Sequence, residues 1–129
     1  MLRLVTVGDV GCAINPALVE GQDIGAATMG LGMAMREELV YEDGNLLNGN
    51  LFEYRVPRTT DMPAFDAILA ERHDGVGVYG AKGGGEGSLN PVAAAIAEAI
   101  HQAAGIRLHE APFSPGRVWQ AIQDRARQA

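Results

Sequence analysis

The chain has 129 residues, of which 47% are hydrophobic, and residues 1–129 are expected to form a single domain. Its formal net charge of −6 argues against a nucleic-acid-binding surface, which would need clustered Lys and Arg. A single cysteine, Cys12, excludes an internal disulfide framework and a cysteine-only zinc site, and no apolar run approaches the roughly 18 residues of a membrane span.

The N-terminal segment is typical of a strand that is already under way. Residues 2–10 carry an apolar pattern that ends at Gly11, and almost nothing precedes it. We therefore expect this chain to be the C-terminal part of a larger polypeptide or one subunit of a split one. The charged start, apolar stretch and cleavage site of a signal peptide are missing, so a cytoplasmic location is expected by default.

A long, glycine-interrupted helix is predicted from Pro16 to Leu39. Pro16 suits the first helical turn, and the Asn15 side chain can cap it. Interior glycines each cost about 1 kcal/mol relative to alanine, so this helix needs tertiary packing to form. Its small residues would let either a neighbouring backbone or a flat ligand approach closely, and both interpretations stay open.

The later elements are short strands and two helices, which makes the fold class α+β. The turn at Asp43-Gly44-Asn45 predicts a hairpin, and Ala64–Ala70 alternates like a strand. A helix is predicted from Pro91 to Ala104, with Gly105 as its C-cap. A last helix starts at Ser114-Pro115. The residues expected to face inward on these two helices are Val92, Ala95, Ile96, Ala99, Ile100, Val118, Trp119 and Ile122.

The most informative stretch is the loop Gly80–Ser88, in which one carboxylate, Glu86, lies among glycines. Such a loop has a high entropic cost of ordering and suits a place where backbone approaches a ligand or another backbone. A lone acid in that position predicts that the acid is presented to a ligand. The alternative is a flexible surface turn with a solvated glutamate.

Other constellations predict little chemistry. Three histidines are scattered without the spacing of metal ligands and are expected at the surface, and Cys12 is expected to be a small buried thiol. The loop is no phosphate-binding P-loop, because Lys82 precedes the glycines and Ser88 is misplaced for magnesium. We predict no metal-ligating residue. The histidines are His73, His101 and His109.

Motifs along about a hundred residues resemble the C-terminal part of the molybdenum-binding large subunit of the xanthine dehydrogenase and aldehyde oxidase family. The resemblance implies that the chain is part of a larger molybdopterin-binding domain. The matching motifs, in chain order, are Asp9-Val10-Gly11, Ile14-Asn15-Pro16, Gly21-Gln22, Gly25-Ala26, Gly30-Leu31-Gly32, Glu37-Glu38-Leu39, Tyr54-Arg55-Val56-Pro57, Gly80-Ala81-Lys82-Gly83-Gly84-Gly85-Glu86 and Pro91-Val92-Ala93-Ala94-Ala95-Ile96.

The resemblance implies hydroxylation of an aldehyde or N-heterocycle with water as the oxygen source. The cofactor of such enzymes is a molybdenum–pterin, often a cytosine dinucleotide in bacteria, and Glu86 matches the general base. By the same resemblance, iron–sulfur clusters and flavin are expected only on partner chains. A carboxylate that a cofactor desolvates should have a raised pKa, which suits deprotonation of a metal-bound hydroxyl.

By the same resemblance, Gln22 bonds the pterin, and the Lys82 and Gly83–Gly85 loop contributes to cofactor binding. The chain departs from the family at Met29, where a second glutamine is common, at Cys12, where a basic residue is common, and at Gly87-Ser88, which replaces a frequent Pro-Pro pair.

The chain is too short to be the whole enzyme. Without the remainder of the molybdenum subunit, we expect the isolated chain to be inactive, to hold no cofactor and to self-associate. The alternative function is a degenerate or excised module that folds and oligomerises without a cofactor.

Overall fold

The computed structural model describes residues 1–70 and 72–128, which divide into two compact units. Unit 1 comprises Met1–Gly30 and Arg58–Asn90, and unit 2 comprises Leu31–Pro57 and Pro91–Ala129. The helix α1 (Pro16–Met35) includes Gly30 and Leu31, where the chain passes from unit 1 to unit 2. The prediction of one domain over residues 1–129 stays a prediction. Among the described helices, none is both long and apolar enough to cross a membrane.

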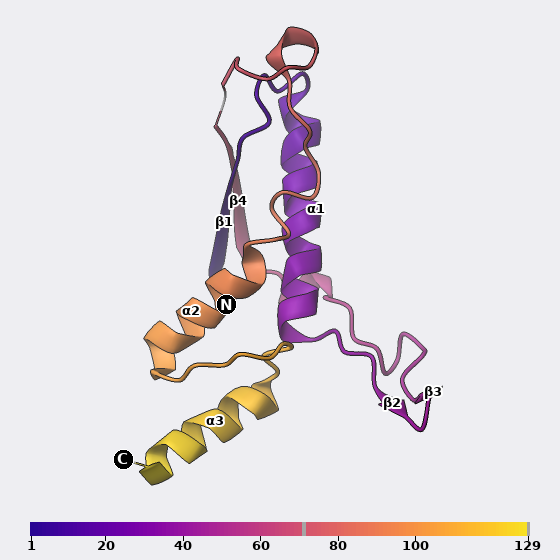
Figure 1. Cartoon of the computed structure of the whole chain (residues 1–129), viewed down its shortest axis with the longest axis vertical. Coiled ribbons are helices and arrows are strands. Elements are labelled where there is room, and N and C mark those ends of the chain that lie inside the picture. Colours follow the sequence, from indigo (N-terminus) through magenta and orange to yellow (C-terminus); the bar gives the residue numbers. More distant parts are fainter. Residues whose placement is uncertain (71, 129) are drawn as a thin grey trace. The chain divides into compact units, whose positions relative to one another are not determined.

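The elements are those expected of an α+β chain (Figure 1), and the predicted fold class is confirmed. Most predicted boundaries are correct to within two residues, but the first helix ends at Met35, four residues before the predicted Leu39. The strands and helices in chain order are β1 Arg3–Gly8, α1 Pro16–Met35, β2 Tyr41–Glu42, β3 Asn45–Leu46, β4 Ala64–Leu69, α2 Val92–Ala104 and α3 Pro115–Gln128, with short 3-10 helices at Thr59–Asp61 and Val78–Gly80.

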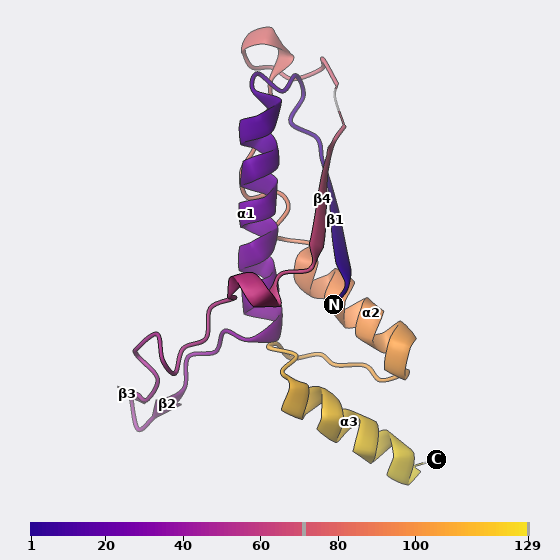
Figure 2. The same cartoon turned by 180° about the vertical axis from the view of Figure 1, so that it is seen from behind.

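Unit 1 is built on a parallel pair of strands that the sequence did not reveal. β1 and β4 pair in register from Arg3 with Ala64 to Gly8 with Leu69, and they lie side by side in both views (Figures 1 and 2). Small residues on α1 form part of the core of this unit, since Ala26 and Ala27 are almost completely buried. The predicted helix cap is confirmed, because Asn15 Oδ1 accepts a hydrogen bond from the Leu18 amide at 3.2 Å.

Unit 2 holds the end of α1, the hairpin and the two C-terminal helices. Gly105 adopts the left-handed conformation, with φ of 66°, and its amide donates to the His101 carbonyl, as predicted for a C-cap. The hairpin turn is also confirmed, since Asp43 and Gly44 both have positive φ. The buried apolar residues of this unit are Leu31, Ala34, Val92, Ile96, Ile106 and Phe113.

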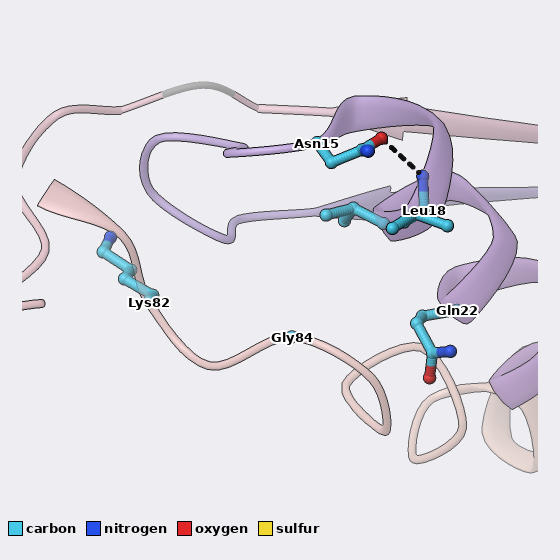
Figure 3. A pocket seen from close by; sticks show the side chains of 6 residues that line it. Asn15, Leu18, Gln22, Lys82 and Gly84 are labelled. Carbon is cyan, nitrogen blue, oxygen red and sulfur yellow. Dashed lines mark hydrogen bonds between the residues drawn. The ribbon is translucent and has the colours of Figure 1, made fainter. Parts of the chain in front are cut away.

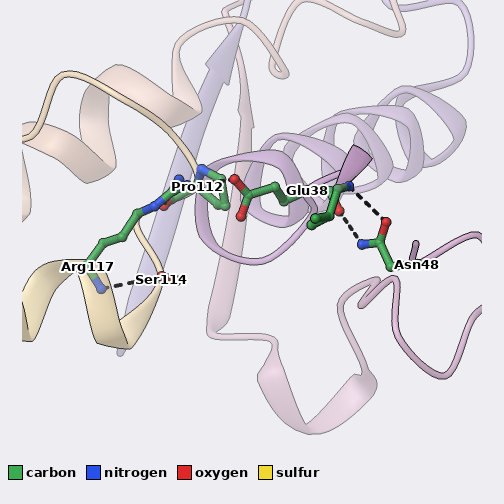
Figure 4. A network of polar contacts seen from close by, with 6 residues as sticks. Glu38, Asn48, Pro112, Ser114 and Arg117 are labelled. Atoms are coloured by element: carbon green, nitrogen blue, oxygen red, sulfur yellow. Dashed lines mark hydrogen bonds and ion pairs between the residues drawn. The ribbon is translucent and has the colours of Figure 1, made fainter. Parts of the chain in front are cut away.

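A polar network fixes the loops of unit 2 (Figure 4). The Arg117 guanidinium donates to Glu38 Oε1 at 2.6 Å and to the Pro112 carbonyl at 3.1 Å. The Asn48 side-chain amide donates to the Glu38 carbonyl at 2.6 Å, and its oxygen accepts from the Val40 amide at 2.9 Å. Glu38 therefore links the start of α3 to the hairpin that follows α1.

The inward faces predicted for the C-terminal helices are partly wrong. On α2, Val92 and Ile96 are buried, but Ala95 and Ala99 are exposed. On α3 no described residue is buried, and Trp119 and Ile122, both expected to face inward, are 60% and 38% exposed. A helical period identifies the apolar face of a helix but not whether this chain supplies the surface that covers it.

Candidate functional site

The glycine loop is held against the segment that follows β1. The Lys82 amide donates to the Val10 carbonyl at 2.8 Å, and the Cys12 amide donates to the Gly80 carbonyl at 3.1 Å. Gly11 lies between these two bonds and pairs with Ala81 in an antiparallel bridge, with φ of +64°. A left-handed glycine is what lets the two backbones approach so closely. The start of α1 and the loop before Glu86 are thereby brought together.

Lys82 carries the charge at this end of the loop. Its ammonium lies 2.8 Å from Asp9 Oδ2 and 2.7 Å from Asp74 Oδ1. These carboxylates raise the pKa of Lys82, the hydrogen bond to Asp74 contributing most. The Lys82 hydrogen bond and the Gly11 amide together lower the pKa of Asp9. The ammonium is therefore engaged within the chain.

A pocket opens between α1 and the loop (Figure 3). Its volume is about 200 Å³, and it is lined by three of the predicted cofactor-binding residues, Gln22, Lys82 and Gly84. Ligand pockets in proteins commonly enclose about 300–1,000 Å³, so this pocket is smaller than a typical ligand site. The other lining residues are Asn15, Leu18 and Val19.

The loop backbone is open at Gly83, whereas at Gly84 a Cβ atom would lie only 3.0 Å from Val10 Cγ1. A Cβ atom on Gly83 would meet nothing within 4 Å, whereas one on Gly85 would lie 3.6 Å from Gln22 Oε1. Gly85 also has φ of +139°, which other residues rarely adopt. Within residues 1–70 and 72–128, the amides of Gly83–Gly85 have no hydrogen-bond acceptor. This segment can therefore offer backbone donors to a ligand that lies against Gln22.

Glu86 is exposed and does not line the pocket. Its carbonyl accepts a hydrogen bond from the Leu89 amide at 3.1 Å, so the residue begins a tight turn directly after Gly85. The structure thus groups Gln22, Lys82 and Gly84 in one pocket, with Gly83, Gly85 and Glu86 on the same loop.

The sequence analysis did not predict one buried, hydrogen-bonded pair of side chains. Ser88 Oγ donates to Asp23 Oδ1 at 2.9 Å, and the two residues are only 6% and 3% exposed. The signal was present in the helical spacing, because Asp23 shares one face of α1 with Ala26 and Ala27. A carboxylate on a face made of buried small residues indicates a buried acid.

The remaining candidate metal-ligating side chains do not form a cluster in the described residues. Among the described residues, no three His, Cys, Asp or Glu side chains lie close enough to hold a metal ion. His73 and His109 are exposed, and His101 is half-buried, with its Nδ1 3.2 Å from the Ile106 carbonyl. Cys12 is only half-buried, so the prediction of a small buried thiol is wrong.

The known proteins that this chain resembles include molybdenum-binding subunits of enzymes. The model of the molybdopterin cofactor-binding domain matches residues 1–63. The chain is 36% identical over 120 residues to the xanthine dehydrogenase molybdenum-binding subunit of Escherichia coli O157:H7, covering 92% of this chain and 16% of that protein. It is also 36% identical over 125 residues to the aldehyde oxidoreductase molybdenum-binding subunit of E. coli K12, covering 95% and 17%.

A solved structure has a similar fold. Quinoline 2-oxidoreductase from Pseudomonas putida 86 matches with a TM-score of 0.84 at 29% identity, over 95% of this chain and 16% of that chain. The present chain therefore spans about a sixth of the length of the relatives it matches.

Proposed function

Because this chain belongs to the xanthine dehydrogenase and aldehyde oxidase family of molybdenum enzymes, we propose that it acts as part of a molybdenum hydroxylase. Its role would be to supply the general base Glu86 and one wall of the cofactor site, in the oxidation of an aldehyde or N-heterocycle with water as oxygen source. The observation that carries the proposal is the meeting of Gln22 with the glycine loop directly before Glu86.

The residues of this wall fit a molybdenum–pterin cofactor. The ring system and phosphates of a pterin need hydrogen-bond partners at close range, and the open Gly83–Gly85 amides and the Gln22 side-chain amide are such partners. The pocket is small for such a group, and we propose that other polypeptide supplies the remaining contacts. The bound cofactor would supply an acidified water and the two-electron acceptor.

Glu86 would act on the proton of that water. An exposed carboxylate at a turn can reach a ligand that covers the loop, and covering it removes the solvent that stabilises its charge. Gln22 would orient the cofactor edge, and the loop amides would fix its distance from Glu86.

The complete assembly would contain further chains. We propose that the remainder of the molybdenum subunit covers this wall, and that iron–sulfur and flavin subunits carry the electrons onward in the cytoplasm. A cytosine dinucleotide form of the pterin is the expected cofactor, and the isolated chain would bind none.

Two variants in the assembled holoenzyme separate the proposed roles. Glu86→Gln keeps the size of the side chain but removes the base, so turnover per molybdenum should fall by about 10²–10⁴-fold with molybdenum content unchanged. Gln22→Ala should instead reduce molybdenum content and change turnover per bound molybdenum much less. Glu110→Gln, the same substitution at an exposed residue outside the loop, is the matched control. Full turnover of Glu86→Gln would show that the proposed function is wrong.

A further inference from the structure

The carboxylate of Asp23 is the second acidic group near the proposed site, and it faces inward. Its side chain lies on α1, is 3% exposed, and accepts the Ser88 hydroxyl at 2.9 Å. Both partners are buried, so water does not compete for the bond, and a hydrogen bond is stronger in such surroundings than at the surface. This single contact joins residues 65 positions apart in the sequence.

Ser88 belongs to the turn that carries Glu86. The Leu89 amide closes that turn on the Glu86 carbonyl at 3.1 Å, so Ser88 lies inside it. On the other side of Glu86, a Cβ atom on Gly85 would be 3.6 Å from Gln22 Oε1. Since Gln22 and Asp23 are neighbours on α1, the helix lies close to the loop just before Glu86 and bonds it just after (Figure 3 shows Gln22 beside the loop).

The loop has few other means of holding this position. Gly83, Gly84, Gly85 and Gly87 have no side chains to pack, and a chain of glycines retains more conformational freedom than any other. Ser88 is therefore the first residue after Glu86 with a side chain that can anchor the turn. The structure uses that side chain for the bond to Asp23.

The second oxygen of Asp23 has no partner to match the Ser88 hydroxyl. Oδ2 is buried and has no hydrogen-bond partner among the described residues. A Cβ atom on Gly8 of β1 would lie only 2.8 Å from it, so the carboxylate fits closely against a glycine. An incompletely paired buried carboxylate destabilises a fold, which points to a role other than stability.

We propose that Asp23 is a positioning residue that fixes the Glu86 carboxylate by holding Ser88. This inference rests on the proposed function of Glu86. Asp23 touches neither substrate nor cofactor and acts only through the Ser88 hydroxyl. Its effect requires a hydrogen-bond acceptor at Oδ1 and does not require the negative charge.

The kinetic test uses the assembled holoenzyme with Asp23→Ala, Ser88→Ala, both together, and Asp23→Asn. Each alanine variant should lower kcat about 10–100-fold at unchanged KM and molybdenum content, because small displacements of a reacting group have effects of this size. The double variant should be no worse than either single one, since both remove the same bond. Asp23→Asn should keep near-normal kcat, because its amide oxygen still accepts from Ser88.

A second readout does not depend on activity. In the full chain, the amides of residues 84–90 should exchange hydrogen faster in Asp23→Ala and Ser88→Ala, but not in Asp23→Asn. Ser114→Ala is the matched control, because it removes a serine hydroxyl that accepts from the Arg117 amide at the start of α3, and it should leave this exchange unchanged. If Asp23→Ala fails to fold, Ser88→Ala alone carries the test.

The outcomes distinguish the two proposals. If Glu86→Gln keeps full turnover, the proposed function is wrong. If Glu86→Gln abolishes turnover while Ser88→Ala leaves kcat and exchange unchanged, only the positioning role is wrong. Additive effects in the double variant, or an Asp23→Asn enzyme as slow as Asp23→Ala, would equally overturn it.

Discussion

Replacing Gly11 by alanine tests how the site is assembled. Gly11 has φ of +64°, and a Cβ atom there would lie 2.2 Å from the Gly80 carbonyl oxygen and 3.2 Å from the Lys82 nitrogen. The neighbour in closest contact is backbone, which cannot rotate away as a side chain can. The loop must therefore move away from the segment that follows β1.

The magnitude follows from two contributions. An alanine in the left-handed region costs about 1–2 kcal/mol relative to glycine. Moving the loop also weakens the Lys82–Val10 and Cys12–Gly80 backbone bonds, each of which contributes about 1 kcal/mol. The free energy of unfolding should thus fall by roughly 3–4 kcal/mol, a large share of the usual 5–15 kcal/mol.

Urea unfolding of the full chain, followed by circular dichroism, measures this change. Gly25→Ala is the matched control, because Gly25 lies inside α1 and a Cβ atom there would meet nothing within 4 Å. That control should gain about 0.5–1 kcal/mol from the higher helix propensity of alanine. An unfolding midpoint of Gly11→Ala equal to that of the unmodified chain would refute the reasoning about the loop contact.

Two further results are expected. The Glu37 carboxylate, which accepts from the Tyr54 hydroxyl at 2.7 Å, raises the pKa of that hydroxyl. The hydrogen bond therefore stabilises the fold fully below the unfolded tyrosine pKa of about 10, and this stabilisation is lost as pH rises through the higher folded pKa. Tyr54→Phe should accordingly remove the part of an alkaline absorbance titration that occurs at the highest pH. The isolated chain should self-associate in light scattering, because Leu18, Met29 and Met33 of α1 are 68%, 48% and 54% exposed; a monomer at high concentration would contradict this.

Local features were predictable from the sequence because their causes are local. The Asp43-Gly44 dipeptide favours positive φ at two successive positions, and the structure has φ of 48° and 79° there. Asn15 before Pro16, and Gly105 after the Ala-rich helix, act within one helical turn of their own position. Such signals require no knowledge of what the rest of the chain does.

Burial was less predictable because it depends on a partner surface. Trp119 lies on an amphipathic helix and was expected to face inward, yet it is 60% exposed. Ala95 and Ala99 were expected to face inward for the same reason, and both are exposed. The chain spans about a sixth of the length of its relatives. The surface that would cover the apolar face of such a helix therefore need not be part of this chain.

The ion pairs of Lys82 could not be predicted from the sequence, for a different reason. Lys82 and Asp9 are 73 residues apart, so the sequence, which predicted only that Lys82 contributes to cofactor binding, could not predict this ion pair. In the folded chain its one positive charge faces the two carboxylates of Asp9 and Asp74. A phosphate would compete with both of them, and the surrounding charge would repel it. We therefore expect Lys82 to contribute to cofactor binding mainly by holding the loop in place, so that Gln22 and the glycine amides make the direct contacts.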